Sequence, residues 1–497
     1  MAELPYQIVV GLEVHVQLLT KSKLFCGCST KFGAPPNSQV CPVCLGMPGV
    51  LPVMNRTAFE LALRAALALN CQIASFTKWD RKNYYYPDLP KNYQISQYDL
   101  PFSSEGWLEI NAATDPKKEY KPKRIGIIRA HLEEDAGKNL HDETGRGGDS
   151  KIDLNRTGTP LLEIVSKPEI NSPEEAKAYL DELRLMLREI GVSDCEMQEG
   201  SLRCDANVNI HVPYEGGTAA TPLVEVKNLN SFGSVGRAIA HEAERQYGEF
   251  QKDPKNYRFG KILKTTAGWD VERGVTVVQR HKEEAADYRY FPEPDLVPVV
   301  VSETELDQAR KAMGELPAAQ RKRLQAPPYS LSAYDAGVLT AKGRKMVAYY
   351  EEVTAAVGDG KQVSNRLSDL VMGALNERGE EIDQFPISAR KFADFMKATA
   401  TAHQQNRRDV FNHMLEHGSD PASAMAALGV KSASDFDEGA LRTAVKDAIA
   451  ANPQAVDDFK KGKTAAANRI KGHVMKNNKG APNDVVQRLL DEELEKA

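Results

Sequence analysis

Apolar and polar residues alternate along several segments of the first 300 residues, which is the pattern of strands with one buried and one polar face. In the segment Ile8–Gln17 every second residue is apolar, and Glu13 and His15 fall on the opposite face. The segment Ser201–Val212 alternates in the same way, with Asp205 on its polar face. These segments predict strands of an antiparallel sheet that gathers acidic and imidazole side chains on one side.

Two further segments continue the strand pattern. One short segment places Glu225 and Lys227 on a single face. Another starts at Ile125 and ends in the acidic run His131-Leu-Glu-Glu-Asp135. Strict alternation would turn Glu134 away from the face of its two neighbours, unless a bulge or the end of the strand changes its direction.

Helical periodicity dominates the chain beyond Ser302. Apolar residues three and four apart predict helices over Lys391–Ala400 and Arg408–His417. In the first half only one helix is clear, where the capping-box sequence Ser172-Pro-Glu-Glu175 precedes an apolar stripe. The first half is therefore expected to be rich in strands and the second half to be helical.

A length of 497 residues supports about three domains. We predict the α+β class, with an N-terminal antiparallel-sheet domain over residues 1–297. An all-helical C-terminal half would follow, made of domains over residues 298–407 and 408–497.

Composition excludes several classes of protein. Hydrophobic residues make up 41% and charged residues 27% of the chain, an ordinary globular balance. No uninterrupted apolar run approaches the roughly 20 residues of a membrane span, and the first residues lack the apolar segment of a secretion signal. A net charge of −5 disfavours a protein that coats DNA. We expect a cytoplasmic protein that does not contact membranes.

Four of the seven cysteines form two close pairs, Cys26/Cys28 and Cys41/Cys44. Two such pairs can bring four thiolates into the tetrahedron that zinc prefers, and a site filled by four thiolates has no open position for chemistry. The pattern predicts a structural zinc site. The alternative is a redox pair at Cys41/Cys44, which the absence of a thioredoxin-like βαβ pattern disfavours.

The acidic strand faces have two interpretations. Antiparallel sheets commonly expose one polar face to water, which is the simpler one. However, Asp and Asn are depleted in strands, and carboxylates gathered on one surface repel each other unless a cation lies among them. Oxygen ligands with one histidine and nearby cations suit Mg²⁺ bridged to nucleotide phosphates. No G-x-x-x-x-G-K-[ST] motif occurs, so a Walker-type ATPase is excluded.

Cations are concentrated in three other tracts. Segments 78–93 and 288–292 mix cations with tyrosines, and such tracts either fill core-to-surface boundaries or stack an adenine or an RNA end. Residues 460–479 contain seven Lys or Arg and no acid. That imbalance favours a phosphate-backbone partner over a solvated helix face.

Several longer motifs resemble the GatB family, the B subunits of aspartyl/glutamyl-tRNA amidotransferases. In the first half these motifs are Gly11–Gln17, Asp80–Asp88, Tyr93–Gln97, His131–Gly137, Asp153–Pro160, Gly200–Asn207 and Lys227–Phe232. Segments Phe459–Lys463 and Gly472–Lys476 resemble the helical GatB/YqeY-type region, which would span about residues 347–497 here. The resemblance covers the whole chain and implies a glutamine-synthetase-like cradle for the sheet domain.

The resemblance also implies an activity. The family acts on misacylated Glu-tRNA(Gln) and Asp-tRNA(Asn): the B subunit phosphorylates the side-chain carboxylate with ATP, and ammonia then displaces phosphate to leave an amide. The ammonia comes from glutamine through a partner amidase, which is the A subunit, while the small C subunit makes the assembly a heterotrimer. The expected cofactors are ATP, Mg²⁺ and structural Zn²⁺.

Site residues follow from the resemblance position by position. The metal and phosphate site would contain Glu13, His15, Glu134, Asp205 and Glu225, with Lys227 as a further catalytic residue; the magnesium ligands would be Glu13, His15, Glu134 and Glu225. The zinc ligands would be Cys26, Cys28, Cys41 and Cys44. The residues expected to bind tRNA are Lys460, Lys461, Lys463, Lys471 and Lys476.

Two other functions remain possible from the residues alone. A free-standing ATP-dependent carboxylate–amine ligase for a small amino acid could use the same sheet, but it would not need the helical half or its basic tract. A scaffold that only binds tRNA would not need Glu13, His15, Asp205 and Glu225 on strand faces. The sequence contains no Gly/Ser-rich amidase tract, so its nitrogen would arrive as ammonia.

Overall fold

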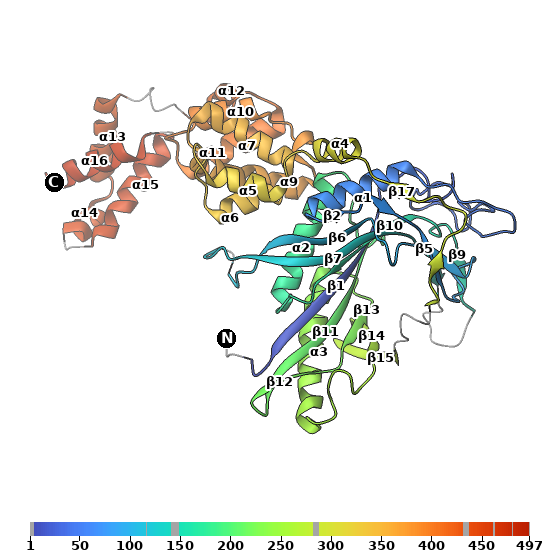
Figure 1. Ribbon diagram of the computed structural model, residues 1–497. Helices are drawn as coiled ribbons and strands as arrows, with labels where there is room; N and C mark the ends of the chain where they lie inside the picture. Colours follow the sequence, from blue (N-terminus) through green and yellow to red (C-terminus); the bar gives the residue numbers. More distant parts are fainter. Residues whose placement is uncertain are drawn as a thin grey trace. The chain divides into compact units, whose positions relative to one another are not determined.

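A computed structural model describes residues 4–115, 117–140, 149–281, 288–430, 437–460, 463–479 and 481–496. The chain divides into two compact units, residues 1–320 and 321–497, and Figure 1 shows the strands in the first and only helices in the described part of the second. This agrees with the predicted α+β class. The domain ends predicted at residues 297 and 407 differ from the division into two units.

The first unit is built on a ten-stranded sheet in which β1 (Gln7–Gln17) is central, paired antiparallel with β10 (Pro160–Ser166) and β11 (Leu202–Tyr214). Neighbours in the sheet are antiparallel except β13 and β14, which run parallel. The other strands are β2 (Gln72–Ile73), β6 (Ser103–Asn111), β7 (Pro122–Glu134), β12 (Gly217–Ala220), β13 (Val224–Lys227), β14 (Thr265–Asp270) and β15 (Val275–His281).

Smaller sheets flank this one. The three-stranded sheet consists of β4 (Asp80–Asn83) between β5 (Tyr93–Ser96) and β16 (Phe291–Pro292). Two two-stranded sheets pair β3 (Phe76–Thr77) with β17 (Val299–Val300) and β8 (Lys138–Leu140) with β9 (Lys151–Asp153).

Helices cover one face of the large sheet. Helix α2 (Pro173–Glu189) packs against α3 (Phe232–Lys252) and β6, and α3 packs against β11 (Figure 1). Helix α1 (Arg56–Ala68) contacts β7 and α4 (Glu303–Met313). The apolar side chains of β1, such as Leu12 and Val14, are completely buried in the core of this unit.

Sequence periodicity found α2 but not the other two long helices of this unit. Ser172 caps α2 by accepting a hydrogen bond from the Glu175 backbone. The reciprocal half of the predicted capping box is absent, because the Glu175 carboxylate accepts from the Asn171 N–H instead. Helix α1 is buried on most of its surface, so it lacks the polar stripe that reveals an amphipathic helix.

The second unit contains two apolar cores, one over residues 324–430 and one over residues 441–494. The first core runs across residue 407, where a domain end was predicted, because α11 and α12 pack against the preceding helices. Its helices are α5 (Pro317–Gln325, which begins in the first unit), α6 (Ala333–Thr340), α7 (Arg344–Val357), α8 (Gly360–Arg366), α9 (Met372–Arg378), α10 (Ala389–Ala398), α11 (Gln404–His417) and α12 (Pro421–Leu428).

The second core lies among α13 (Glu438–Ala450), α14 (Pro453–Lys460), α15 (Ala467–Asn477) and α16 (Asn483–Leu494). The helices predicted over 391–400 and 408–417 correspond to α10 and α11. Among the described residues, no helix is both long and apolar enough to cross a membrane.

Gly106 in β6 is held in close contact with its neighbours. An added Cβ would lie 2.4 Å from Cys71 Sγ and 2.5 Å from the Leu69 carbonyl oxygen. Gly106→Ala should therefore lower the unfolding free energy of the first unit by about 1–3 kcal/mol. The three tryptophans all lie in this unit, so denaturation followed by their fluorescence reports on it alone: Trp79, Trp107 and Trp269.

The matched control is Gly248→Ala in α3, where an added Cβ meets nothing within 4 Å. Alanine restricts the unfolded chain and favours the helix, so this variant should gain about 0.5–1 kcal/mol. Equal stability of the two variants would contradict the packing described for β6.

Candidate metal and catalytic site

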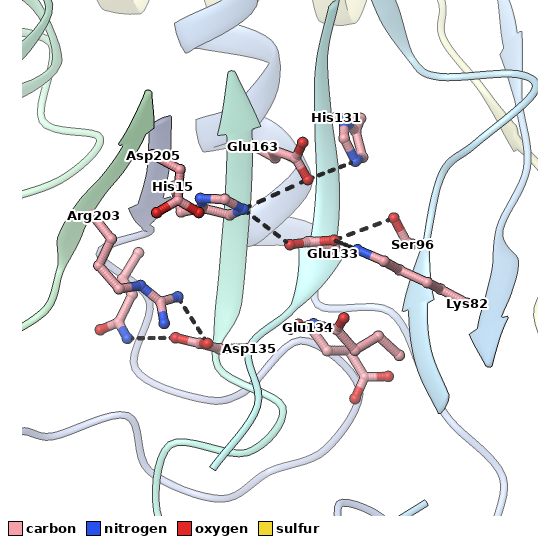
Figure 2. Close-up of polar contacts among 12 residues, drawn as sticks. His15, Lys82, Ser96, His131, Glu133, Glu134, Asp135, Glu163, Arg203 and Asp205 are labelled. Carbon is pink, nitrogen blue, oxygen red and sulfur yellow. Dashed lines mark hydrogen bonds and ion pairs between the residues drawn. The ribbon is translucent and has the colours of Figure 1, made fainter. Parts of the chain in front are cut away.

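The face of the large sheet opposite helices α2 and α3 carries a compact cluster of His15, Glu133 and Glu163, three residues whose ligand atoms all lie within 4.8 Å of one another (Figure 2). The Nε2 atom of His15 lies 3.7 Å from a Glu163 oxygen and 3.8 Å from a Glu133 oxygen. The three residues come from β1, β7 and β10, which are neighbours in the sheet. One imidazole nitrogen and two carboxylates within this distance suit a divalent cation.

The charges in this cluster depend on one another. Burial alone lowers the pKa of His15, but a hydrogen bond and the charges of Glu163 and Glu133 outweigh burial and raise it. Burial would raise the pKa of Glu163, yet His131 and His15 hold it well below the usual value. Burial raises the pKa of Glu133. Burial also lowers the pKa of His131 to about 4, so His131 is neutral at pH 7.

Three residues around the cluster complete it. His131 Nε2 lies 3.4 Å from Glu163, while its Nδ1 is buried without a hydrogen-bond partner in the described part of the chain. Lys82 Nζ lies 3.9 Å from a Glu133 oxygen, and the Ser96 hydroxyl lies 3.5 Å from the same oxygen (Figure 2). Burial lowers the pKa of Lys82, but Glu133 and Glu163 outweigh this and raise it, so the side chain is charged.

A second acidic group lies farther along the same face, on β1, β11 and β13. Glu13 faces Asp205 across the β1–β11 pair. Lys227 Nζ lies 2.5 Å from Asp205 and 3.2 Å from Glu225. The structure therefore brings together four predicted site residues from three strands, with Lys227 between two of the carboxylates.

Glu134 does not join either group. It is the last residue of β7, and its carboxylate forms an ion pair with Lys91 and accepts a hydrogen bond from the Ile95 backbone. It lines a pocket together with Cys26 and Cys44, away from His15. No bulge interrupts β7 at this point, so alternation turns Glu134 away and presents Glu133 to His15.

Asp135 supports the end of the site. Its buried carboxylate accepts hydrogen bonds from Gln17 Nε2 at 2.9 Å and from Arg203 Nη2 at 2.8 Å (Figure 2). Arg156 lies 3.5 Å from the same carboxylate. Burial would raise the pKa of Asp135, but Arg203 and Arg156 outweigh this and lower it. These contacts join β1 and β11 to the loop that follows β7.

Sequence analysis missed Glu133, Glu163, His131 and Lys82 as members of the site. Period two already placed His131 and Glu133 on one face, so the acidic run held a usable signal. Glu163 is the only acid in the apolar strand Pro160–Ser166, which is a weaker signal. Lys82 lies in a strand of four residues, too short for any periodicity to indicate its direction.

The four predicted zinc ligands, Cys26, Cys28, Cys41 and Cys44, form a second cluster with sulfur atoms within 4.8 Å of one another. Sulfurs about 2.3 Å from a tetrahedral zinc ion lie about 3.8 Å apart, and Cys41 and Cys44 are separated by 3.9 Å. The buried ammonium of Lys23 lies 3.6 Å from Cys44 Sγ. Hydrogen bonds with the Cys26 side chain and from the Cys41 backbone, together with the charge of Lys23, outweigh burial and lower the pKa of Cys44 to about 4. This cluster fits a structural metal ion.

The basic tract lies in the last helical region. Lys471 and Lys476 belong to α15, and Lys471 Nζ donates to Gln487. Lys463 precedes that helix and pairs with Asp458, while Lys460 ends α14. Lys461 lies outside the described residues. Of the described lysines in this tract, Lys460, Lys463 and Lys476 are exposed and Lys471 is half-buried.

Fold and site together define a protein of two units, one with a cluster of histidine and carboxylate side chains on a sheet that suits a metal ion, and one that is helical. Comparison makes the class specific: residues 8–307 match the family described as GatB/GatE catalytic domain, and residues 348–494 match the one described as GatB domain. The chain belongs to the GatB family.

Curated relatives match along the whole chain, and each is named as the B subunit of aspartyl/glutamyl-tRNA(Asn/Gln) amidotransferase. The chain is 50% identical over 488 residues to the relative from Rhodopirellula baltica, covering 98% of this chain and 96% of the relative. It is 47% identical over 494 residues to the relative from Caldanaerobacter subterraneus, covering 99% and 100%. The relative from Carboxydothermus hydrogenoformans is 45% identical over 495 residues, covering 99% of each chain.

The cysteine cluster yields a stability prediction. Cys41→Ser removes one thiolate, so the bound metal and the folding free energy that it contributes should both be lost from the first unit. The tryptophan-monitored unfolding midpoint should fall, while the helical unit stays folded by circular dichroism. Metal analysis of the unsubstituted protein should find about one zinc per chain. Protein without metal, whose stability a chelator leaves unchanged, would contradict this assignment.

Proposed function

We propose that the chain is the subunit of a tRNA-dependent amidotransferase that activates and amidates the amino acid on misacylated tRNA. It phosphorylates the side-chain carboxylate of Glu-tRNA(Gln), Asp-tRNA(Asn) or both with ATP, and ammonia then replaces the phosphate. The observation that carries this proposal is the cluster of His15, Glu133 and Glu163 on the polar sheet face. Membership of the GatB family supports the choice of reaction.

Activation by phosphate is chemically necessary because a carboxylate is a poor electrophile. Attack of a carboxylate oxygen on the γ-phosphorus of ATP releases ADP and makes an acyl phosphate, which has a good leaving group. Ammonia then attacks the acyl carbon, phosphate leaves, and the nitrogen gives up a proton. Bound Mg²⁺ would neutralise the phosphates and orient them in line.

We assign two groups of side chains in this chain to that reaction. His15, Glu133 and Glu163 would hold the metal ion. The second group of Glu13, Asp205, Glu225 and Lys227 extends the site along the same face, where it can hold a second cation or orient nucleotide phosphates. Lys227 offsets the repulsion between Asp205 and Glu225 in the absence of such ligands.

The resemblance implied that Glu134 belongs to the metal and phosphate site, but this proposal does not place it there. Its carboxylate is occupied by Lys91 and by the backbone of β5. We therefore assign Glu133 the ligand position on β7 and give Glu134 a structural part between the cradle and the cysteine cluster.

Two further parts of the proposal concern metal and partners. The cysteine cluster holds Zn²⁺, because four thiolates with tetrahedral spacing suit this ion and leave it no open position. The nitrogen comes as ammonia from a partner glutaminase of the amidase type, and a small third protein makes the enzyme a heterotrimer. The relatives are named as one lettered subunit of an amidotransferase, which supports a multi-subunit enzyme.

The helical unit and its basic tract favour this function over a ligase for a free amino acid. Such a ligase would need neither α15 nor its lysines. A phosphate backbone gives those cations a partner, and tRNA is the substrate that carries both a phosphate backbone and an activated amino acid.

The active-site prediction uses substitutions that preserve shape. Glu13→Gln keeps an acceptor for the 2.7 Å hydrogen bond from Asn207, and Asp205→Asn removes one charge beside Lys227. Folding, metal content of the cysteine cluster and tRNA binding should survive. Amide formation should fall by at least about 100-fold, the scale of lost electrostatic stabilisation.

The assay is ATP-dependent conversion of Glu-tRNA to Gln-tRNA with ammonium chloride, which bypasses the glutaminase of a partner. Glu272→Gln, at an exposed position between β14 and β15, is the control and should keep full activity. Normal conversion by either active-site variant would refute the assignment of the second acidic group.

The basic tract of residues 460–479 yields a prediction about the affinity for tRNA. Replacing Lys463, Lys471 and Lys476 by Gln should weaken tRNA binding and reduce the slope of log K against log salt by about 2–3, because each phosphate contact contributes roughly 0.7–0.9. Turnover at saturating tRNA should change little.

The control is the triple variant Lys117→Gln, Lys118→Gln and Lys121→Gln, which removes as many exposed charges from the first unit. If the variant of Lys463, Lys471 and Lys476 kept its tRNA affinity but lost turnover, these lysines would not bind the phosphate backbone of tRNA.

A further inference from the structure

Lys82 places a cation beside the proposed metal ligands without using its hydrogen-bond donors. Its nearest carboxylate oxygen, on Glu133, is 3.9 Å away, beyond hydrogen-bond distance. No hydrogen bond joins its Nζ to any other described residue. Its side chain is 22% exposed, which leaves the ammonium partly desolvated. An ammonium has three donors, and those of Lys82 are open to water or to the oxygens of a ligand.

The backbone around Lys82 fixes this position. Strand β4 lies between β5 and β16, and Lys82 faces Gln94 in the register with β5. The neighbouring Arg81 points elsewhere: it forms two hydrogen bonds with the buried carboxylate of Glu293, at 2.7 and 2.9 Å, and lies over the ring of Tyr93. Alternation along β4 therefore directs Lys82 toward the cluster while Arg81 holds the strand.

The segment from Tyr288 to Asp295 lies beside this strand and places an aromatic ring near Lys82. The ring centroid of Tyr288 lies 5.4 Å from Lys82 Nζ, a cation–π distance. Asn83 Nδ2 donates to the Arg289 carbonyl at 2.8 Å, which attaches the segment to β4. An aromatic face restrains an ammonium without accepting its hydrogens in the way an oxygen does. Lys82 is therefore held in place, with its donors available.

We propose that Lys82 is a further catalytic residue, which donates hydrogen bonds to the non-bridging oxygens of the phosphoryl group during its transfer. This rests on the proposed function. A metal ion held by His15, Glu133 and Glu163 would take up the Glu133 charge that now faces Lys82. Lys82 and the metal would then share one anion, and three phosphoryl oxygens offer acceptors to both.

Lys82 remains protonated through both steps of the reaction. In the first step an oxygen of the substrate carboxylate forms a bond to the γ-phosphorus, the bond to the bridging oxygen breaks, and ADP leaves. In the second step ammonia forms the C–N bond, the C–O bond to phosphate breaks, and one proton leaves the nitrogen. Lys82 stabilises the phosphoryl charge in the first step and the departing phosphate in the second.

The test compares Lys82→Met with wild type and with Lys252→Met in the assembled amidotransferase. Lys252 lies at the end of α3, where its side chain is 73% exposed and pairs only with Glu249 among the described residues. We expect Lys82→Met to lower kcat for ammonium-dependent amidation by at least about 100-fold, with KM for ATP changed by less than about fivefold. Cleavage of ATP in the presence of Glu-tRNA, without ammonia, should fall in parallel. Lys252→Met should match wild type.

A second measurement separates catalysis from structure. Mn²⁺ alone, titrated and followed by electron paramagnetic resonance, reports on the metal ligands independently of turnover. Lys82→Met should bind Mn²⁺ at least as well as wild type, because a competing cation near Glu133 is gone. Lys82→Arg, which keeps the charge but changes its geometry, should recover part of kcat.

Several outcomes would overturn the inference. Wild-type kcat in Lys82→Met, or Mn²⁺ affinity lost in proportion to kcat, would each exclude a direct contact with the phosphoryl group. Normal ATP cleavage with lost amidation would exclude the proposed role of Lys82 in phosphoryl transfer. If the wild-type enzyme itself made no Gln-tRNA from ammonium, the proposed function would fail, and the role of Lys82 with it. Active wild type beside an equally active Lys82→Met would refute the role of Lys82 alone.

Discussion

The central position of β1 between two antiparallel partners is the constraint on which the rest of the first unit depends. Side chains on a strand alternate with period two, so every residue of β1 that is not in the core points to the opposite face. Because the register sets Glu13 opposite Asp205 and His15 opposite both Arg203 and Glu163, polar residues from three strands meet there. A shift of one residue would bury these charges and expose Leu12 and Val14.

That arrangement gathers more negative charge than a sheet face tolerates without compensation. The protein balances it with its own cations, Lys227 between Asp205 and Glu225 and Arg203 on Asp135. His15 lies between Glu133 and Glu163, whose charges raise its pKa. These pairs lie on the polar face of the sheet, whereas the apolar core of this unit lies on the other face. Ligands that bring positive charge, such as a metal ion, can therefore replace protein cations without disturbing the core.

The two units also differ in the side chains that they gather. The sheet unit concentrates acids and one metal-type cluster on a rigid surface, which suits chemistry that depends on positioning. The helical unit presents lysines beside the second of its two apolar cores, and such a concentration of cations suits contact with an extended polyanion. The cysteine cluster lies in the sheet unit, where its four thiols come from two separate pairs and fit a structural metal ion.

Local pattern alone determined much of this protein. Period two identified β1, β7, β11 and β13 and the polar faces that carry Glu13, His15, Asp205 and Glu225, because alternation depends only on neighbouring residues. Cysteine spacing indicated the four-thiol cluster for the same reason. Only the tertiary structure decided which acids meet: Glu163 reaches His15 through the pairing of β1 with β10, and Lys82 arrives from a separate small sheet. It also turned Glu134 toward Lys91 and Glu133 toward His15. Such choices follow from register and from contacts between distant segments, and no local sequence pattern encodes them.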